Sequence, residues 1–289
     1  MLPIIGYLLR LYFYFKIIIN NLKIFKMNQE QKLEGLGKFL EEFANYEFVE
    51  TDLYLIESVA HMLVKYGFHP TYELCEKIDK STFLIKKPPF HMEGNCLKHT
   101  QLALREIMSY PEHDVLDMII FFYHDLMEHE VMMGKIDTLV KSIENPSDKL
   151  IDEVEFYAFD KVISKEDVKP SSIIPKDIID RIDGINNYGH EDASADYAVE
   201  SLKRDFYIFD EGILNEVEFC IRFHMQGFFI DKKKNPKEVR NLILSPYFNR
   251  LKRVWLADYN GRISDDPKIT MSQLEQKILA NPMAKKLMK

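Results

Sequence analysis

Apolar residues in the middle of the chain follow the pattern of a buried helix. The run from Val115 to Tyr123, VLDMIIFFY, is apolar around nearly the whole circumference of a 3.6-residue turn, which is typical of a helix covered on most sides. His124 and Asp125 follow directly. Ionisable side chains at the end of such a helix are costly unless their charges are matched, and a divalent cation bound to both provides that match. The pattern therefore predicts a core helix that ends at a metal site.

A His-Asp dipeptide is by itself a weak signal in a chain with nine histidines. A second copy, His113-Asp114, follows Pro111 in polar surroundings, where we expect a turn or the start of a helix. The hypothesis of a metal site at His124-Asp125 therefore depends on which other residues lie at helical spacing along the chain.

Helical spacing recurs on both sides of the buried run. Apolar residues from Leu33 to Phe43 share one helical face, and a second helix is expected over 53–66, ending at Gly67. Residues from about 130 to 187 form a predicted helical insert, interrupted by prolines, that could cover the site as a lid. The sequence contains no phosphate-cradling glycine loop, GxSxG motif, zinc-finger spacing or internal repeat. These patterns predict an all-α protein.

The length of the chain, 289 residues, allows one large or two modest domains, each with its own core. We divide it by composition and pattern into four parts. These are an apolar basic tail (1–26), an N-terminal helical segment (27–94), a main helical domain (95–265) that contains the insert (about 130–187), and a C-terminal helical tail (266–289).

The first 26 residues differ from the rest because they are rich in Ile, Leu, Phe and Tyr and contain no Asp or Glu. Arg10 and Lys16 interrupt the apolar run well before the roughly 20 residues that a membrane-spanning helix needs. Two interpretations remain: a basic, aromatic segment that lies on a membrane surface, or a start assigned too early, with Met27 as the true first residue. We favour the second, because the sequence from Met27 reads as an ordinary soluble N-terminus.

The overall charge and the cysteines limit the classes of function. A net charge of −8 and a pI near 5.7 argue against bulk nucleic-acid binding. The three cysteines form no CxxC pair and leave an odd number, which fits reduced, buried thiols in a reducing compartment. We therefore expect a cytoplasmic protein.

Further candidate ligands share helical faces with apolar residues. His99 lies on an apolar helical stripe, His224 continues another, and Asp258 shares a face with Trp255. His190 lies at the start of a predicted helix. A lone histidine on an apolar stripe is more often a satisfied core residue than a ligand, but an unpaired carboxylate such as Asp258 on that face needs a cation.

Taken in order, these residues form the series H, HD, H, H, D, which resembles that of the HD-domain metal-dependent phosphohydrolase superfamily. The chain is most similar to the HD domain of bacterial CCA-adding tRNA nucleotidyltransferases. The resemblance spans about residues 91–265, and the nucleotidyltransferase domain is absent, so that CCA addition is not implied. The segments that carry it are HMEGNCLKH (91–99), YHD (123–125), YGHEDASA (188–195), FHM (223–225), NPKEV (235–239) and ADYNGR (257–262).

The resemblance implies an HD-type helical bundle that holds one or two divalent ions, which could be Mn, Ni, Co, Fe, Zn or Mg. With two ions, Asp125 would be the bridge. The implied metal ligands are His99, His124, Asp125, His190, His224 and Asp258.

Three other groups of residues could act on the substrate. Glu128 in HDLME is similar to the glutamate of the HDxxE form found in HD-type 5′-nucleotidases and (p)ppGpp hydrolases, where it assists catalysis; the alternative is a surface acid at a helix end. We place Glu128 one helical turn after His124. Arg262 is the candidate phosphate clamp, because a guanidinium binds phosphate through two hydrogen bonds. Lys232–Lys234, Arg250 and Arg253 could form a basic lip or be solvated singly.

The expected function is that of a phosphomonoesterase or 2′,3′-cyclic phosphodiesterase acting on a nucleotide or an RNA end, with water activated by metal. The alternative within hydrolases is a (p)ppGpp or dNTP hydrolase. Two other classes are an HD-fold di-iron oxygenase and a non-catalytic scaffold with a structural metal, although six candidate ligands exceed what a structural site needs.

Overall fold

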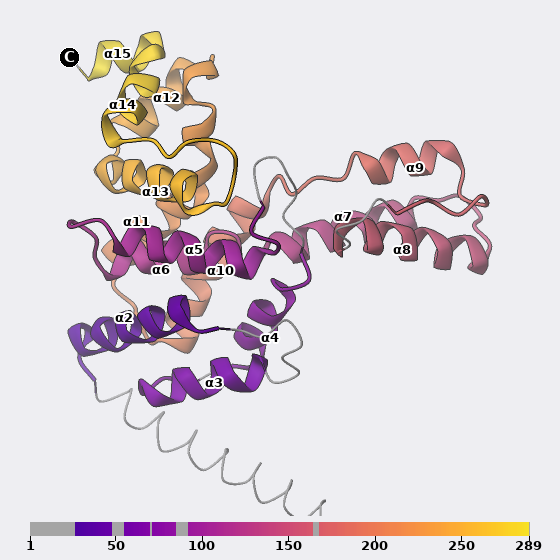
Figure 1. Cartoon of the computed structure of the whole chain (residues 1–289), viewed down its shortest axis with the longest axis horizontal. Coiled ribbons are helices and arrows are strands. Elements are labelled where there is room, and N and C mark those ends of the chain that lie inside the picture. Colours follow the sequence, from indigo (N-terminus) through magenta and orange to yellow (C-terminus); the bar gives the residue numbers. More distant parts are fainter. Residues whose placement is uncertain (1–26, 48–54, 70, 85–91, 164–167, 289) are drawn as a thin grey trace, which may run out of the picture.

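The computed structural model describes residues 27–47, 55–69, 71–84, 92–163 and 168–288. Every regular element within these ranges is an α-helix or a short 3₁₀ helix (Figure 1), which confirms the predicted all-α class. The predictions made for 1–26 lie outside the described residues. Within the described ranges, none of the helices combines the length and the apolar character that crossing a membrane requires.

A helix that is almost completely buried lies at the centre of the body. This helix, α6 (Val115–Tyr123), buries every residue from Asp117 onward, as its apolar pattern predicted. It contacts the four helices that carry or adjoin the other candidate ligands. These are α5 (Cys96–Met108), α10 (His190–Asp205), α11 (Glu211–Arg222) and α13 (Phe248–Gly261).

The start of α6 is set by Asp114, which caps the helix together with Asp117 in a reciprocal capping box. The expectation of a helix start at His113-Asp114 is therefore confirmed. Arg250 reaches both carboxylates, at 2.6 Å from Asp114 and 2.8 Å from Asp117, and Arg253 lies 3.1 Å from Asp117. Because these ion pairs occupy both guanidinium groups, Arg250 and Arg253 form neither the possible basic lip nor the singly solvated charges considered as its alternative.

The N-terminal helices cover one side of this core. α2 (Gln29–Asn45) packs against α5 and α6, and the rings of Phe39 and Phe43 meet Phe122 edge-on at 5.6 and 5.2 Å between centroids. α3 (Leu55–Lys65) and α4 (Tyr72–Lys80) pack on each other beside it. Gly67 follows α3 with a φ of +90°, a conformation that favours glycine, so the predicted end of this helix is confirmed.

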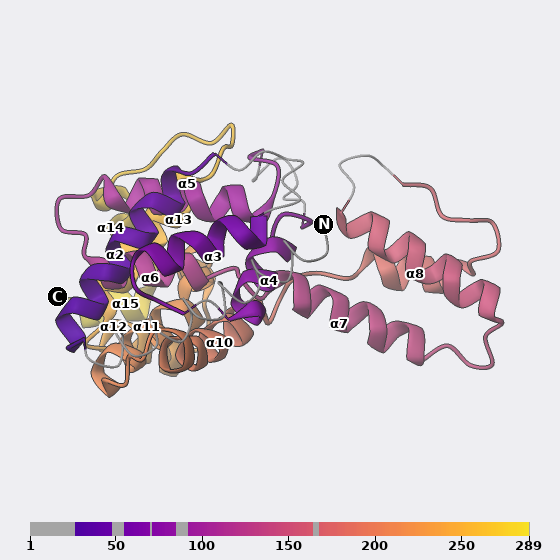
Figure 2. The same ribbon diagram turned by 90° about the horizontal axis from the view of Figure 1, so that it is seen from below.

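Three helices form an arm that projects from the body (Figures 1 and 2). They are α7 (Glu128–Lys141), α8 (Asp148–Ile163) and α9 (Lys176–Asp183), and they share a small apolar core of their own. The predicted breaks near prolines separate them. Both views show the arm extending away from the body rather than across it, so the expectation of a lid over the site is not met by these helices.

The C-terminal part of the chain packs on the far side of α13. It comprises η2 (Ile230–Lys232), α12 (Pro236–Ile243), α14 (Met271–Ala280) and α15 (Pro282–Leu287). Lys233, another residue of the expected basic lip, donates to Gln226 and lies 2.7 Å from Glu238. The three cysteines are free and buried, as expected, and burial raises the pKa of the Cys75 thiol to about 12.

Candidate metal centre

The six predicted ligands come together where the ends of five elements meet. His99 lies one turn into α5, His190 begins α10, His224 begins the 3₁₀ helix η1 (His224–Phe228), and Asp258 lies in α13. His124 and Asp125 follow the last residue of α6. None of the six exposes more than 4 % of its surface. This is a buried cluster of imidazoles and carboxylates that could hold a metal ion.

The chain turns sharply at the His-Asp pair. The His124 amide still donates to Ile120 at 2.9 Å, closing α6, and the Glu128 amide donates to the Asp125 carbonyl at 3.0 Å as α7 begins. Glu128 was expected one turn farther along the helix of His124; instead it opens a new helix. The tight turn keeps it near Asp125, since oxygen atoms of both carboxylates lie within 4.8 Å of one another.

All four histidines are oriented through Nδ1. That nitrogen lies 2.8 Å from the Phe121 carbonyl in His124, 2.8 Å from the Asn187 carbonyl in His190 and 2.7 Å from the Ile221 carbonyl in His224. In His99 it lies 2.8 Å from the Glu93 carboxylate. An oxygen acceptor at Nδ1 fixes the proton there and leaves the lone pair on Nε2. The Nε2 atoms of His124, His190 and His224 are therefore left as acceptors or metal ligands, while His99 Nε2 faces the Asp258 carboxylate.

The Asp125 carboxylate lies between two pairs of Nε2 atoms. Its Oδ1 is 3.0 Å from His190 and 3.4 Å from His224, and its Oδ2 is 3.4 Å from His124 and 3.7 Å from His99. The Nε2 atoms of His190 and His224 are themselves 3.4 Å apart. Each oxygen thus faces its own pair of imidazoles, which is the arrangement expected of a carboxylate shared between two ligand sets.

Burial lowers the pKa of His124 to about 4, although the charge of Asp125 opposes this shift. The ring is consequently neutral at physiological pH and able to bind a cation. Its Nε2 is buried and makes no hydrogen bond to any described residue. A buried acceptor without a donor is costly, and a metal ion at this position would satisfy it.

Asp258 completes one side of the cluster, with Oδ1 at 3.2 Å from His99 Nε2. Burial raises the pKa of this carboxyl, but the hydrogen bond from His99 and the charge of Arg262 more than offset that effect and hold it well below its ordinary value. The guanidinium of Arg262 lies against Phe228 and Tyr259, at 4.4 and 5.1 Å from their ring centres. Apart from its Nε, which donates to the Asp258 carbonyl, its guanidinium makes no hydrogen bond within the described part of the chain.

Glu128 is buried, and a hydrogen bond from Asn187 holds it in place. Its carboxylate accepts a hydrogen bond from the Asn187 amide, and the Cys96 thiol lies beside it, donating to the Asp125 carbonyl at 3.6 Å. The alternative of a surface acid at a helix end is therefore excluded for Glu128. A fixed, buried carboxylate next to Asp125 can accept or donate a proton at the cluster.

Two residues that position the cluster were not predicted from the sequence. Glu93 supports His99, and its second oxygen accepts from the Ile263 amide at 3.2 Å. Asn187 holds both Glu128, through its side chain, and His190, through its carbonyl. Glu93 lies within HMEGNCLKH, and Asn187 directly precedes YGHEDASA, two of the segments that carry the family resemblance. Only the folded chain shows which of their polar residues face inward.

The charges of the cluster also fit a bound cation. Four carboxylates, those of Glu93, Asp125, Glu128 and Asp258, lie among the imidazoles, and Arg262 is the one arginine or lysine that the cluster itself contains among the described residues. Buried charges need partners, and imidazole with carboxylate suits Zn, Fe, Ni, Co or Mn. Comparison with protein-family models, with curated proteins and with solved structures finds nothing that matches this chain.

Proposed function

We propose that this chain is a metal-dependent phosphohydrolase of the HD-domain type, acting as a phosphomonoesterase or 2′,3′-cyclic phosphodiesterase on a nucleotide or an RNA end. The observation that carries the proposal is the convergence of four Nε2 atoms and two carboxylates in one buried cluster. The order of these residues along the chain, H, HD, H, H, D, supports the same family.

The residues would share the binding of metal in two sets. His99, His124 and Asp258 face one side of Asp125, and His190 and His224 face the other. A divalent cation bound there would make water acidic enough to react near neutral pH and would offset negative charge that develops on phosphoryl oxygens. Ionised carboxylates in the cluster would repel a phosphate, and bound divalent cations would offset their negative charge.

Glu128 and Arg262 would act on the substrate. The hydrogen bond from Asn187 fixes the Glu128 carboxylate beside Asp125, where it can orient a water molecule or protonate the leaving oxygen. Arg262 is held by two aromatic rings and keeps its Nη donors without a protein partner among the described residues. Such a group can bind phosphate through two hydrogen bonds.

Phosphate release by the full chain tests this proposal. The protein is loaded with Mn, Co, Ni or Zn and offered 2′,3′-cyclic nucleotides, nucleoside monophosphates, dNTPs and (p)ppGpp. We expect turnover of a monophosphate or cyclic phosphate, and a loss of roughly 10²- to 10⁴-fold in kcat for Glu128→Gln with bound metal retained. His129→Gln, a change in a buried histidine outside the cluster, is the matched control.

Three outcomes would count against the proposal. If only (p)ppGpp or dNTP is hydrolysed, the proposed substrate class is wrong, although the protein is still a phosphohydrolase. Hydrolysis that survives Asp125→Asn unchanged would show that the cluster is not the active site. Stoichiometric metal with no phosphate release from any substrate would overturn the hydrolase and leave a metal-binding protein.

A further inference from the structure

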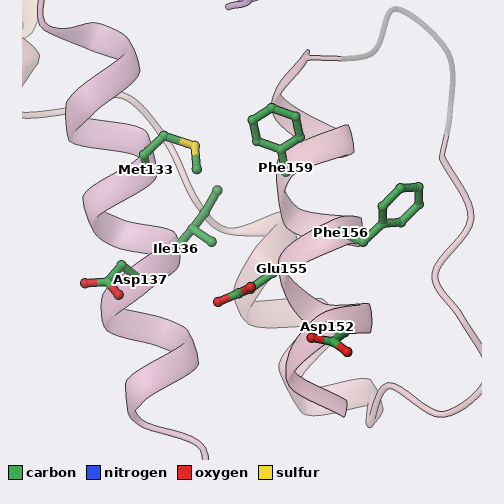
Figure 3. A pocket seen from close by; sticks show the side chains of 7 residues that line it. All are labelled: Met133, Ile136, Asp137, Asp152, Glu155, Phe156 and Phe159. Carbon is green, nitrogen blue, oxygen red and sulfur yellow. The ribbon is translucent and has the colours of Figure 1, made fainter. Parts of the chain in front are cut away.

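The arm carries an open groove between α7 and α8, away from the metal centre (Figure 3). The groove has a volume of about 510 Å³. Met133 and Ile136 of α7 line one side, and Glu155 and Phe159 of α8 line the other. Phe156 also borders the groove, with its ring turned away from α7. The groove between these two packed helices therefore combines apolar and acidic side chains.

The two phenylalanines are exposed although α8 already has a buried face. Val154, Tyr157 and Ala158 fill the small core of the arm, while Phe156 and Phe159 expose 68 % and 40 % of their surface. They are three residues apart and so lie one turn from each other on the helix. Large apolar side chains left exposed together mark an interaction site more often than they serve the fold.

Acidic side chains are the polar part of the groove lining. Asp152 and Glu155 line it from α8 and make no ion pair with any described residue, while Asp137 of α7 pairs with Lys141. Over its whole length α8 has five acidic residues and two lysines. Negative charge beside apolar side chains repels nucleic acids and anionic lipids and attracts Lys and Arg.

We propose that this groove binds a basic amphipathic helix of a partner protein. Two neighbouring helices with apolar side chains along the groove between them can accept a third helix as in a bundle, through side chains spaced three and four residues apart. The apolar face of the partner covers Phe156 and Phe159, and its lysines or arginines face Asp152 and Glu155. The groove contains no residue of the metal centre, so this proposal does not depend on the proposed hydrolase activity.

A synthetic helix provides the probe. The full chain is titrated into a fluorescein-labelled 18-residue peptide with Leu at positions i, i+3, i+4 and i+7 and Lys elsewhere, and binding is followed by fluorescence anisotropy. The control peptide keeps the Leu pattern and replaces Lys with Glu. We expect the Lys peptide to bind at least about tenfold more tightly than the Glu peptide, with an affinity that falls as salt rises.

Matched variants locate the contact. Phe156→Ala should weaken binding about tenfold, whereas Phe209→Ala, at a phenylalanine that is 60 % exposed outside the arm, should leave it unchanged. Asp152→Lys with Glu155→Lys should abolish the preference for the Lys peptide. Glu57→Lys with Glu112→Lys changes the net charge by the same amount at exposed positions outside the arm. This pair should keep the preference for the Lys peptide.

Other results would overturn the proposal. If both charge-reversed pairs lose the same amount of affinity for the Lys peptide, the peptide is attracted by the overall charge of the protein. If both phenylalanine variants lose the same amount of affinity, the groove is not the binding site. If sedimentation shows a dimer, and Phe156→Ala converts it to a monomer, the groove is occupied by a second copy of this chain. Carbodiimide cross-links from Lys16 or Lys23 to Asp152 or Glu155, formed without the peptide, would make the chain's own first residues the occupant.

Discussion

Each histidine of the metal centre is fixed by a specific acceptor. In three of them Nδ1 faces a carbonyl oxygen three residues earlier in the chain, whereas in His99 it faces the Glu93 carboxylate. A carboxylate behind an imidazole fixes the plane of the ring and makes Nε2 more basic. Glu93 should therefore influence metal binding without touching the metal.

Glu93→Gln tests this positioning role. Because the charge behind His99 is lost while the shape is kept, we expect the affinity for Mn or Co to fall about 10- to 100-fold, measured by calorimetric titration of the full chain. Glu57→Gln, at an exposed carboxylate on α3, should change nothing. Unchanged affinity in Glu93→Gln, together with weakened binding in His99→Ala, would mean that the carboxylate does not support the ligand.

The sequence predicted single residues well where helical periodicity placed them. His99 and Asp258 face inward because each lies on the apolar stripe of a regular helix. Glu128 was misplaced, since extending the helix of His124 ignored the turn that separates α6 from α7. Arg250 was misread because its partners, Asp114 and Asp117, are more than 130 residues away in the chain, and no local pattern reports such pairs.

The packing of α5 on α13 sets the distance between His99 and Asp258. At the crossing of these helices, a Cβ placed on Gly261 would lie 2.7 Å from the Cα of Ala103. This contact is to backbone, so one helix must move to accept any side chain at that position. Both elements were predicted, but their close approach depends on a glycine that has no distinctive local pattern.

Gly261→Ala should therefore lower the free energy of unfolding by about 1–3 kcal/mol, as other overpacked cores do, and weaken metal binding by separating α5 from α13. Urea denaturation and a metal titration measure the two effects. Gly134→Ala is the control, because nothing lies within 4 Å of its added Cβ in α7. If Gly261→Ala is as stable as Gly134→Ala, the two helices are not held in tight contact there.

The first turn of α6 gives a test with a defined pH dependence. Burial raises the pKa of Asp114, but the hydrogen bond and charge of Arg250, with the capping bonds, lower it below 3.8 overall. A folded pKa below the unfolded value means that the stabilisation is complete above about pH 3.8 and is lost as the pH falls through the folded pKa.

Asp114→Ala removes this cap and should reduce the free energy of unfolding by about 1–2 kcal/mol at pH 7. The difference from the unaltered protein should shrink as the pH falls below 3.8, which urea denaturation at several pH values would measure. Asp265→Ala, an exposed aspartate outside any helix, serves as the control. A difference that stays constant between pH 7 and 3 would show that the charge of Asp114 contributes nothing.

At the scale of the whole molecule, a helical body holds the cluster and an arm projects from its edge (Figures 1 and 2). The arm begins at Glu128 and returns to the body just before His190, so both of its attachments adjoin the cluster. The helices of this insert follow from periodicity and proline breaks. The direction in which the arm projects could not be predicted. It depends on the packing of Leu84 and Cys96 against the arm, and these segments are far apart in sequence.

The central claim is that the buried cluster binds divalent metal. Elemental analysis of the full chain, after incubation with Mn, Co, Ni and Zn and removal of the excess, measures this directly. We predict one or two ions per chain, a loss of most of this metal in Asp125→Asn, and no loss in His129→Gln. Fewer than one metal ion per chain in the unaltered protein would contradict the account. The same metal content in Asp125→Asn as in the unaltered protein would also contradict it.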